Sequence, residues 1–259
     1  MNSATHPLHL RGRTIDFVTF EGWFSRWLAQ VILDGQTYPI PPFVSDVQVI
    51  LDVGANCGAA STYFADHFPD AKLYAFEPAA ATFAILERNV ERLPNVTAFN
   101  FGLHDHDATV QLFGGVEDPA TASVVQGREQ TGESETIEVK DAGAWVAASG
   151  LDRIDILKVD TEGCEVEIFG QILDLVSATT KVVYLEYHSD EDRRTLDAML
   201  SPSHKLVYGQ NHLDTGELTY LSRRVVEGNR SEIVDWIEKL FGEELRGSAA
   251  RIAANAPES

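Results

Sequence analysis

Apolar residues in this chain occur in short continuous runs, separated by stretches in which they recur at helical spacing. A continuous run is typical of a strand buried on both faces, and helical spacing is typical of an amphipathic helix. The runs predict strands at residues 47–53, 71–76, 96–101, 154–159, 181–187, 205–208 and 218–221. Alternating strands and helices favour parallel pairing with right-handed crossovers, and the last two runs suggest an antiparallel closing pair. The expected fold is α/β, a doubly wound, mostly parallel seven-stranded sheet.

The pattern also divides the chain. Residues 47–222 are expected to form the main domain, after an N-terminal extension at residues 1–46 and before a C-terminal helical tail at residues 223–259. Within the domain, residues 107–140 form a lid-like insertion, in which short strands at 110–113 and 136–140 flank a polar loop at 117–134. The apolar face of the tail at residues 231–241 could pair with a second copy of the chain, so a homodimer is one possible assembly.

An amphipathic helix is predicted at residues 21–33 of the extension, which we expect to be helical. An aromatic cluster at this segment consists of Phe20, directly before it, and Trp23, Phe24 and Trp27 within it. Such a stripe either docks the helix on the core or forms a platform for a sugar or flat ring, and docking is the favoured interpretation.

The charge of the chain limits its partners. The 259 residues contain 20 Lys+Arg and 40 Asp+Glu, for a formal net charge of −20. An acidic surface repels phosphate backbones and anionic lipid, so we expect no nucleic-acid and no membrane partner. A neutral or cationic small molecule fits better, although acidity can also serve solubility alone.

Cysteine usage and the absence of long apolar runs indicate a cytoplasmic protein. Cys57 and Cys164 are the only cysteines and lack the spacing of a metal site or disulfide framework. The first residues contain no signal-peptide pattern, and no run approaches the roughly 20 apolar residues of a membrane span.

A glycine turn directly follows the first predicted strand, at residues 50–58 (ILDVGANCG). Ligands of open α/β sheets bind beyond the carboxyl ends of the strands, where such a turn lies. Gly54 would let the backbone pass close to a ligand, and Gly58 would allow close entry into the helix. Asp52 could accept a hydrogen bond from a cationic amino group. A tight connection without a ligand is the simpler alternative.

An acidic residue, Glu77, ends the second predicted strand and could accept both hydroxyls of a ribose. Together with the glycine turn it indicates a nucleoside-containing cofactor. A dinucleotide site would require Gly-x-Gly-x-x-Gly, whereas Asn56 and Cys57 stand where further glycines would lie. Because Asp52 would repel a phosphate but suit an ammonium, S-adenosylmethionine is the predicted cofactor.

Two further strand ends contain the candidate catalytic residues. Asp160 and Glu162 follow the fourth strand and could bind a metal, hold a substrate hydroxyl or take its proton. Glu162 could instead cap the next helix. Glu186 and His188, at the end of the fifth strand, point to the same side of the sheet.

His188 is the predicted base, oriented by Glu186 or Asp160, although a histidine at a strand end is equally often only hydrogen-bonded. In an alternative form of the mechanism, Asp160 and Glu186 bind a magnesium ion. His104 and His106 flank Asp105 in a loop expected near the adenine and are weaker candidates for the base.

These motifs together resemble the FkbM family of methyltransferases. The resemblance extends over residues 47–188, and its most specific element is Lys-x-Asp-x-Glu-Gly at residues 158–163. It implies a Rossmann-like class I fold and methylation of hydroxyls on sugars, glycans or natural products. By analogy the residues expected to bind the cofactor are Asp52, Gly54, Asn56, Gly58 and Glu77, with Gly102 and Leu103 at the adenine. Asp160, Glu186 and His188 would face the acceptor.

The sequence departs from the family pattern at residues 139–142 (VKDA), at Cys57 and at Gly170, none of which touches the proposed chemistry. The predicted function is S-adenosylmethionine-dependent O-methylation of a sugar or oligosaccharide, with a polyketide-type acceptor as the alternative. Two other classes remain open, a nicotinamide oxidoreductase and a non-catalytic cofactor-binding module.

Overall fold

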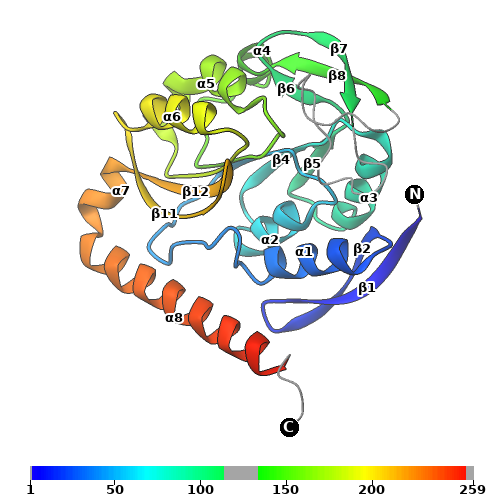
Figure 1. Ribbon diagram of the computed structural model, residues 1–259. Helices are drawn as coiled ribbons and strands as arrows, with labels where there is room; N and C mark the ends of the chain where they lie inside the picture. Colours follow the sequence, from blue (N-terminus) through cyan, green and yellow to red (C-terminus); the bar gives the residue numbers. More distant parts are fainter. Residues whose placement is uncertain (1, 114–133, 255–259) are drawn as a thin grey trace.

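The computed structural model describes residues 2–113 and 134–254 and is built around a seven-stranded sheet (Figure 1). The strand order is β11-β12-β10-β9-β3-β4-β5. The strands span β3 (Val49–Val53), β4 (Lys72–Phe76), β5 (Val96–Phe99), β9 (Ile156–Val159), β10 (Val182–Tyr187), β11 (His204–His212) and β12 (Thr215–Ser222). β12 runs antiparallel to β10 and β11, and the other pairs are parallel. The predicted doubly wound, mostly parallel seven-stranded sheet is confirmed.

Helices cover both faces of this sheet. One face packs against α1 (Trp23–Leu33), α2 (Ala59–His67) and α3 (Ala80–Val90), and the other against α4 (Ala142–Ala148), α5 (Glu165–Thr179) and α6 (Asp190–Leu200). Neighbouring residues of β3 show the division, since Ile50 belongs to the first apolar cluster and Leu51 to the second. Side chains of a strand alternate between the two faces, so a strand buried on both reads as a continuous apolar run.

The N-terminal extension contains a β-hairpin in addition to the predicted helix. β1 (Ser3–Leu10) pairs with β2 (Arg13–Phe20) around a turn at Arg11 and Gly12. The predicted helix is present as α1, and the hairpin before it was not predicted. Leu8 and Phe17 of the hairpin are almost fully buried, because the hairpin packs on α1.

The expected docking of the aromatic stripe is wrong for the three of its four residues that lie in α1. Trp23, Phe24 and Trp27 are 79%, 36% and 42% exposed, and only Phe20 is buried. The helix packs instead through Ala29 and Leu33, which lie at helical spacing on its opposite face.

The predicted insertion forms a second, three-stranded sheet in the order β6-β8-β7. Its strands are β6 (Gly102–His104), β7 (Ala108–Phe113) and β8 (Ser134–Asp141). The two predicted short strands are present and longer than expected, while the joining loop falls almost wholly outside the described residues. In Figure 1 this sheet lies at the top, away from the hairpin and the tail.

The described part of the chain ends in α7 (Arg223–Gly228) and α8 (Arg230–Ala254), which confirms the C-terminal helix. Ile233 and Trp236 of α8 are buried, the latter in an edge-to-face contact with Phe43. Val234 and Phe241 are exposed, so part of the apolar face of the tail is left uncovered by the described residues of this chain. None of the described helices combines the length and apolarity that crossing a membrane requires.

Candidate functional site

A cavity opens beyond the carboxyl ends of β3, β4 and β9, where the glycine turn was predicted to bind a ligand. The space within it and at its mouth, open solvent included, amounts to about 710 Å³. Its polar wall comes from the strand ends, and its apolar wall from Leu103 and the β7–β8 sheet. The lining residues are Val53, Gly54, Asn56, Glu77, Pro78, Ala79, Gly102, Leu103, Leu112, Ile137, Val139, Asp160, Thr161, Glu162 and Cys164.

Two of the turns that border the cavity have unusual backbone conformations. Gly54 has φ of 79°, and a Cβ atom built on it would lie 1.7 Å from the carbonyl oxygen of Asp160. Glycine is therefore required where the β3 turn passes the β9 turn. Asn56 and Glu162 also have positive φ, 49° and 58°, which asparagine tolerates and glutamate rarely adopts. Strain of this kind is concentrated at functional sites.

Glu77 lies in the cavity wall with its carboxylate held by the backbone. One oxygen accepts from the amide of Asn56 at 3.0 Å, and the other from the amide of Ala79 at 2.9 Å. Each carboxylate oxygen has two acceptor sites, so one remains on each for a diol. Burial raises the pKa of Glu77 to about 7, against the lowering effect of the two amides.

Asp52 lies behind the cavity rather than in its wall. Its carboxylate is fully buried, accepts from the Ser61 hydroxyl at 2.6 Å, and lies 3.5 Å from the Lys158 ammonium. Lys158 also donates to the carbonyl oxygen of Gly54 at 2.5 Å and lies 3.3 Å from Asp160. The ammonium thus joins the two turns on which the cavity is built.

A second group of ionisable side chains surrounds His188 at the ends of β9 and β10. Its Nδ1 lies 3.2 Å from Glu165, and its Nε2 lies 3.2 Å from Glu162 and 3.7 Å from Glu186. Burial opposes protonation of the ring, but the bonds to Glu162 and Glu165 outweigh it and raise the pKa of His188 to about 11. The ring is therefore cationic at neutral pH, which does not favour its expected role as the base.

The carboxylates beside His188 repel one another. Glu186 pairs in register with Glu217 across the β10–β12 ladder, and like charges in that position are destabilising. Burial and the charge of Asp160 raise the pKa of Glu186 to about 9 and that of Glu217 to about 7. Protonation of one or both, or a bound cation, relieves this repulsion.

The structure brings most of the sequence-predicted residues to one edge of the sheet. Gly54, Asn56, Glu77, Gly102, Leu103 and Asp160 line the cavity. Donor atoms of Asp160, Glu186 and His188 lie within 4.8 Å of one another. Gly58 begins α2 with φ of 84°, close against Leu86, and like Asp52 it shapes the site without lining the cavity.

Three residues with structural roles in the site escaped the sequence argument. Glu165 accepts from the amides of Thr161 and Gly163, so it holds the β9 turn as well as His188. Lys158 supplies the cation beside Asp52 and Asp160, and Glu217 supplies the carboxylate opposite Glu186. Lys158 was visible as a cation inside an apolar run, and an acid at the first turn of a helix could have indicated Glu165. Nothing in the local pattern distinguished Glu217.

The strand order, the antiparallel β12 and the cavity at the carboxyl edge define a Rossmann-like protein of the class I methyltransferase type. Comparison with known protein families identifies one family. The methyltransferase FkbM domain matches residues 52–209, and the chain belongs to this family. The predicted resemblance is confirmed.

Several curated proteins are similar to this chain. Methyltransferase 1 of Beauveria bassiana is 28% identical over 54% of this chain and 63% of its own length. The 2-O-methyltransferase NoeI of Sinorhizobium fredii is 24% identical over 55% of the chain and 64% of its own. The hexuronic acid methyltransferase AglP of Haloferax volcanii is 27% identical over 59% of the chain and 61% of its own. The match therefore spans less than two thirds of each of these relatives.

Proposed function

We propose that this chain transfers the methyl group of S-adenosylmethionine to a hydroxyl of a sugar or oligosaccharide. The observation that supports this proposal best is the charge of the cavity. Its wall contains Glu77, Asp160 and Glu162, and among the described residues that line it none is Lys or Arg. Such a wall suits a cationic nucleoside and disfavours the pyrophosphate of a nicotinamide cofactor.

The residues present fit the proposed cofactor. S-adenosylmethionine would supply a methyl group on a sulfonium, from which a neutral thioether leaves. Glu77 retains acceptor capacity for the ribose hydroxyls, and Gly54 lets the β3 turn lie against the β9 turn in the cavity wall. Leu103, Leu112 and Ile137 offer an apolar surface suited to a flat base.

Asp160 is the carboxylate best placed to receive the acceptor. It lines the cavity, its side chain is 24% exposed, and it forms an ion pair with the buried Lys158. It would orient the acceptor hydroxyl and accept its proton, the two tasks that a displacement at an activated methyl group requires. We assign Glu186 to the acceptor side as a hydrogen-bonding group. His188, as a buried cation, would position Glu162 and Glu186.

In the alternative mechanism with magnesium, Asp160 and Glu186 are ligands of the metal ion. A divalent ion between them would relieve their repulsion and lower the pKa of a bound hydroxyl. Full activity after exhaustive chelation and gel filtration would exclude this mechanism, whereas loss that magnesium restores would favour it.

Two relatives support this proposal: NoeI is a 2-O-methyltransferase, which favours an oxygen acceptor, and AglP is a hexuronic acid methyltransferase, which favours a sugar. A polyketide-type acceptor is the second candidate. Cytoplasmic location and a homodimer remain predictions, as do the domain boundaries.

Calorimetric titration with S-adenosylhomocysteine tests the cofactor site. We compare wild type with Glu77→Gln, which keeps the shape of the side chain but removes its charge and half of its acceptors. Glu87→Gln, on the exposed side of α3, is the matched control. We expect affinity to fall in Glu77→Gln by about tenfold or more, the loss of one to two charged hydrogen bonds, and to stay unchanged in the control.

Absence of binding to folded wild-type protein would refute the proposal. Binding without methylation of any acceptor, in a panel of sugars, glycans and polyketides, would favour a non-catalytic module instead.

A further inference from the structure

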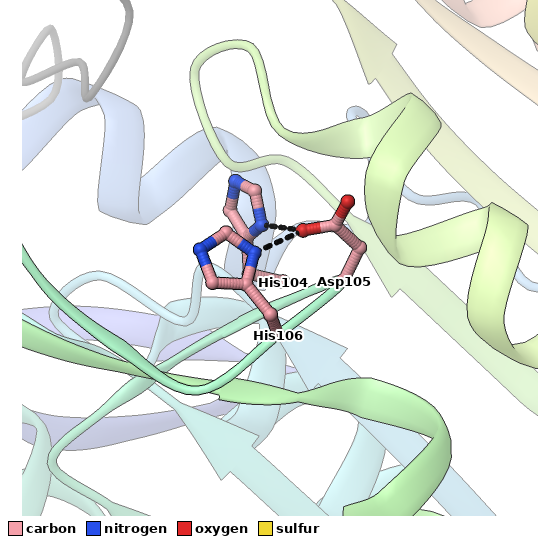
Figure 2. A group of neighbouring side chains, drawn as sticks. All are labelled: His104, Asp105 and His106. Carbon is pink, nitrogen blue, oxygen red and sulfur yellow. Dashed lines mark hydrogen bonds and ion pairs between the residues drawn. The ribbon is translucent and has the colours of Figure 1, made fainter.

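A second group of potential metal ligands lies outside the charged site, in the turn that follows β6. His104, Asp105 and His106 are consecutive, and Figure 2 shows both imidazoles turned toward the same carboxylate oxygen of Asp105. The Nδ1 atom of each ring lies 2.5 Å from that oxygen. The ring centroids are 4.9 Å apart, and one donor atom from each residue lies within 4.8 Å of the other two.

The backbone fixes this tripeptide at both ends. His104 pairs with Asp141 at the end of the β6–β8 ladder. Asp107 then accepts from the amide of Asp141 at 2.8 Å, and the Asp141 side chain caps α4 through the amide of Ala144. The three side chains are therefore carried by a short, anchored turn, which reduces the entropy lost when they bind one ion.

The chemistry of the three groups selects a class of ion. Asp105 offers one carboxylate oxygen that the Nδ1 atoms of His104 and His106 share. An ionised carboxylate only accepts, and each Nδ1 at hydrogen-bond distance must hold a proton. A metal ion replaces those protons as the shared partner. Two imidazoles and one carboxylate are ligands preferred by zinc, nickel, cobalt and copper rather than by magnesium.

We propose that His104, Asp105 and His106 form a binding site for a divalent transition-metal ion of the zinc class. The side chains are accessible to an ion from solvent, with His104 20%, Asp105 41% and His106 60% exposed. The site adjoins the cofactor cavity, because Leu103 lines that cavity and immediately precedes His104. Three protein ligands leave a coordination position for water or a small ligand.

Neither cysteine belongs to this group of donor atoms, and both are buried.

The test is calorimetric titration of the untagged full chain with zinc chloride, in excess magnesium chloride to occupy carboxylate sites. Cobalt chloride, followed by its visible absorption, is the second probe and reports the ligand geometry. We expect one zinc equivalent on wild type and its loss, or an affinity at least about tenfold weaker, in His104→Ala and in His106→Ala. His9→Ala, which removes an exposed histidine of the hairpin, should bind as wild type.

Failure of wild type to bind zinc under these conditions would overturn the proposal. Zinc binding that is unchanged in both His104→Ala and His106→Ala would overturn it equally. Because the readout is metal binding rather than methyl transfer, neither result bears on the proposed enzyme activity.

Discussion

Gly54 is the position at which one added methyl group should do the most local damage. An alanine there would need φ near 79°, a conformation that costs an L-residue about 1–2 kcal/mol. Its Cβ would also lie 1.7 Å from the Asp160 carbonyl oxygen, so the β3 and β9 turns must separate by about an ångström or more. Overpacking of this kind adds about 1–3 kcal/mol, for a total of about 2–5 kcal/mol.

Gly12 offers a control that separates the two costs. It has φ of 81°, almost the same as Gly54, and a Cβ built on it meets nothing within 4 Å. Gly12→Ala should therefore lose only the conformational part. Urea unfolding followed by tryptophan fluorescence gives the free energy of unfolding for wild type and both variants.

We expect Gly54→Ala to be less stable than Gly12→Ala by about 1–3 kcal/mol. It should also lose binding of S-adenosylhomocysteine under conditions in which it is still folded, whereas Gly12→Ala should bind normally. Equal destabilisation of the two variants would refute the close approach of the turns. Normal binding by Gly54→Ala would refute the placement of the cofactor beside this turn.

Three further predictions concern the buried charges. Lys158→Met should lower the free energy of unfolding by about 3–5 kcal/mol, because it leaves two carboxylates without their cation, and adding Asp52→Asn should restore part of the loss in the same urea assay. No recovery in the double variant would contradict this reason. The pKa of His188, about 11, exceeds the ordinary value near 6.5, so the folded state retains a proton that the unfolded state loses. This proton stabilises the folded state fully below pH 6.5, and the free energy of unfolding should decline from there toward pH 11 by up to about 1.4 kcal/mol per pH unit. The decline should be seen in wild type but not in His188→Gln. If the free energies of unfolding of the two proteins run parallel between pH 7 and 10, the prediction is wrong. Asp160→Asn should reduce kcat about 10²–10⁴-fold, with a smaller effect on cofactor affinity. The assay is methyl transfer to the best acceptor of the panel, and an unchanged kcat would remove Asp160 from the proposed chemistry.

Much of the central sheet could be predicted because its signals are local. A strand covered on both faces must be apolar throughout, and β3 is buried at every position. The glycine turn and Glu77 were also accessible, because each directly follows its own strand. The N-terminal hairpin was missed since it contains polar residues on its open face, and its burial depends on packing of both strands against α1 and of β2 against α3.

The exposed aromatic residues of α1 show a limit of periodicity. Trp23, Phe24 and Trp27 recur at helical spacing, but the smaller Ala29 and Leu33 form the buried contact. An apolar stripe indicates a helix, yet the fold decides which side of that helix it covers.

From the sequence alone followed the alternation of strands and helices in the central sheet, the glycine turn, and the acid that ends the second predicted strand, because each depends on neighbours within a few residues. The tertiary structure decided the charge states. Lys158 bridges Asp52 and Asp160, Glu165 reaches back to the β9 turn, and Glu217 faces Glu186 only because β12 pairs beside β10. The pKa of a side chain depends on burial and on charges that folding brings near, so a histidine that resembles a base in the sequence becomes a buried cation in the structure.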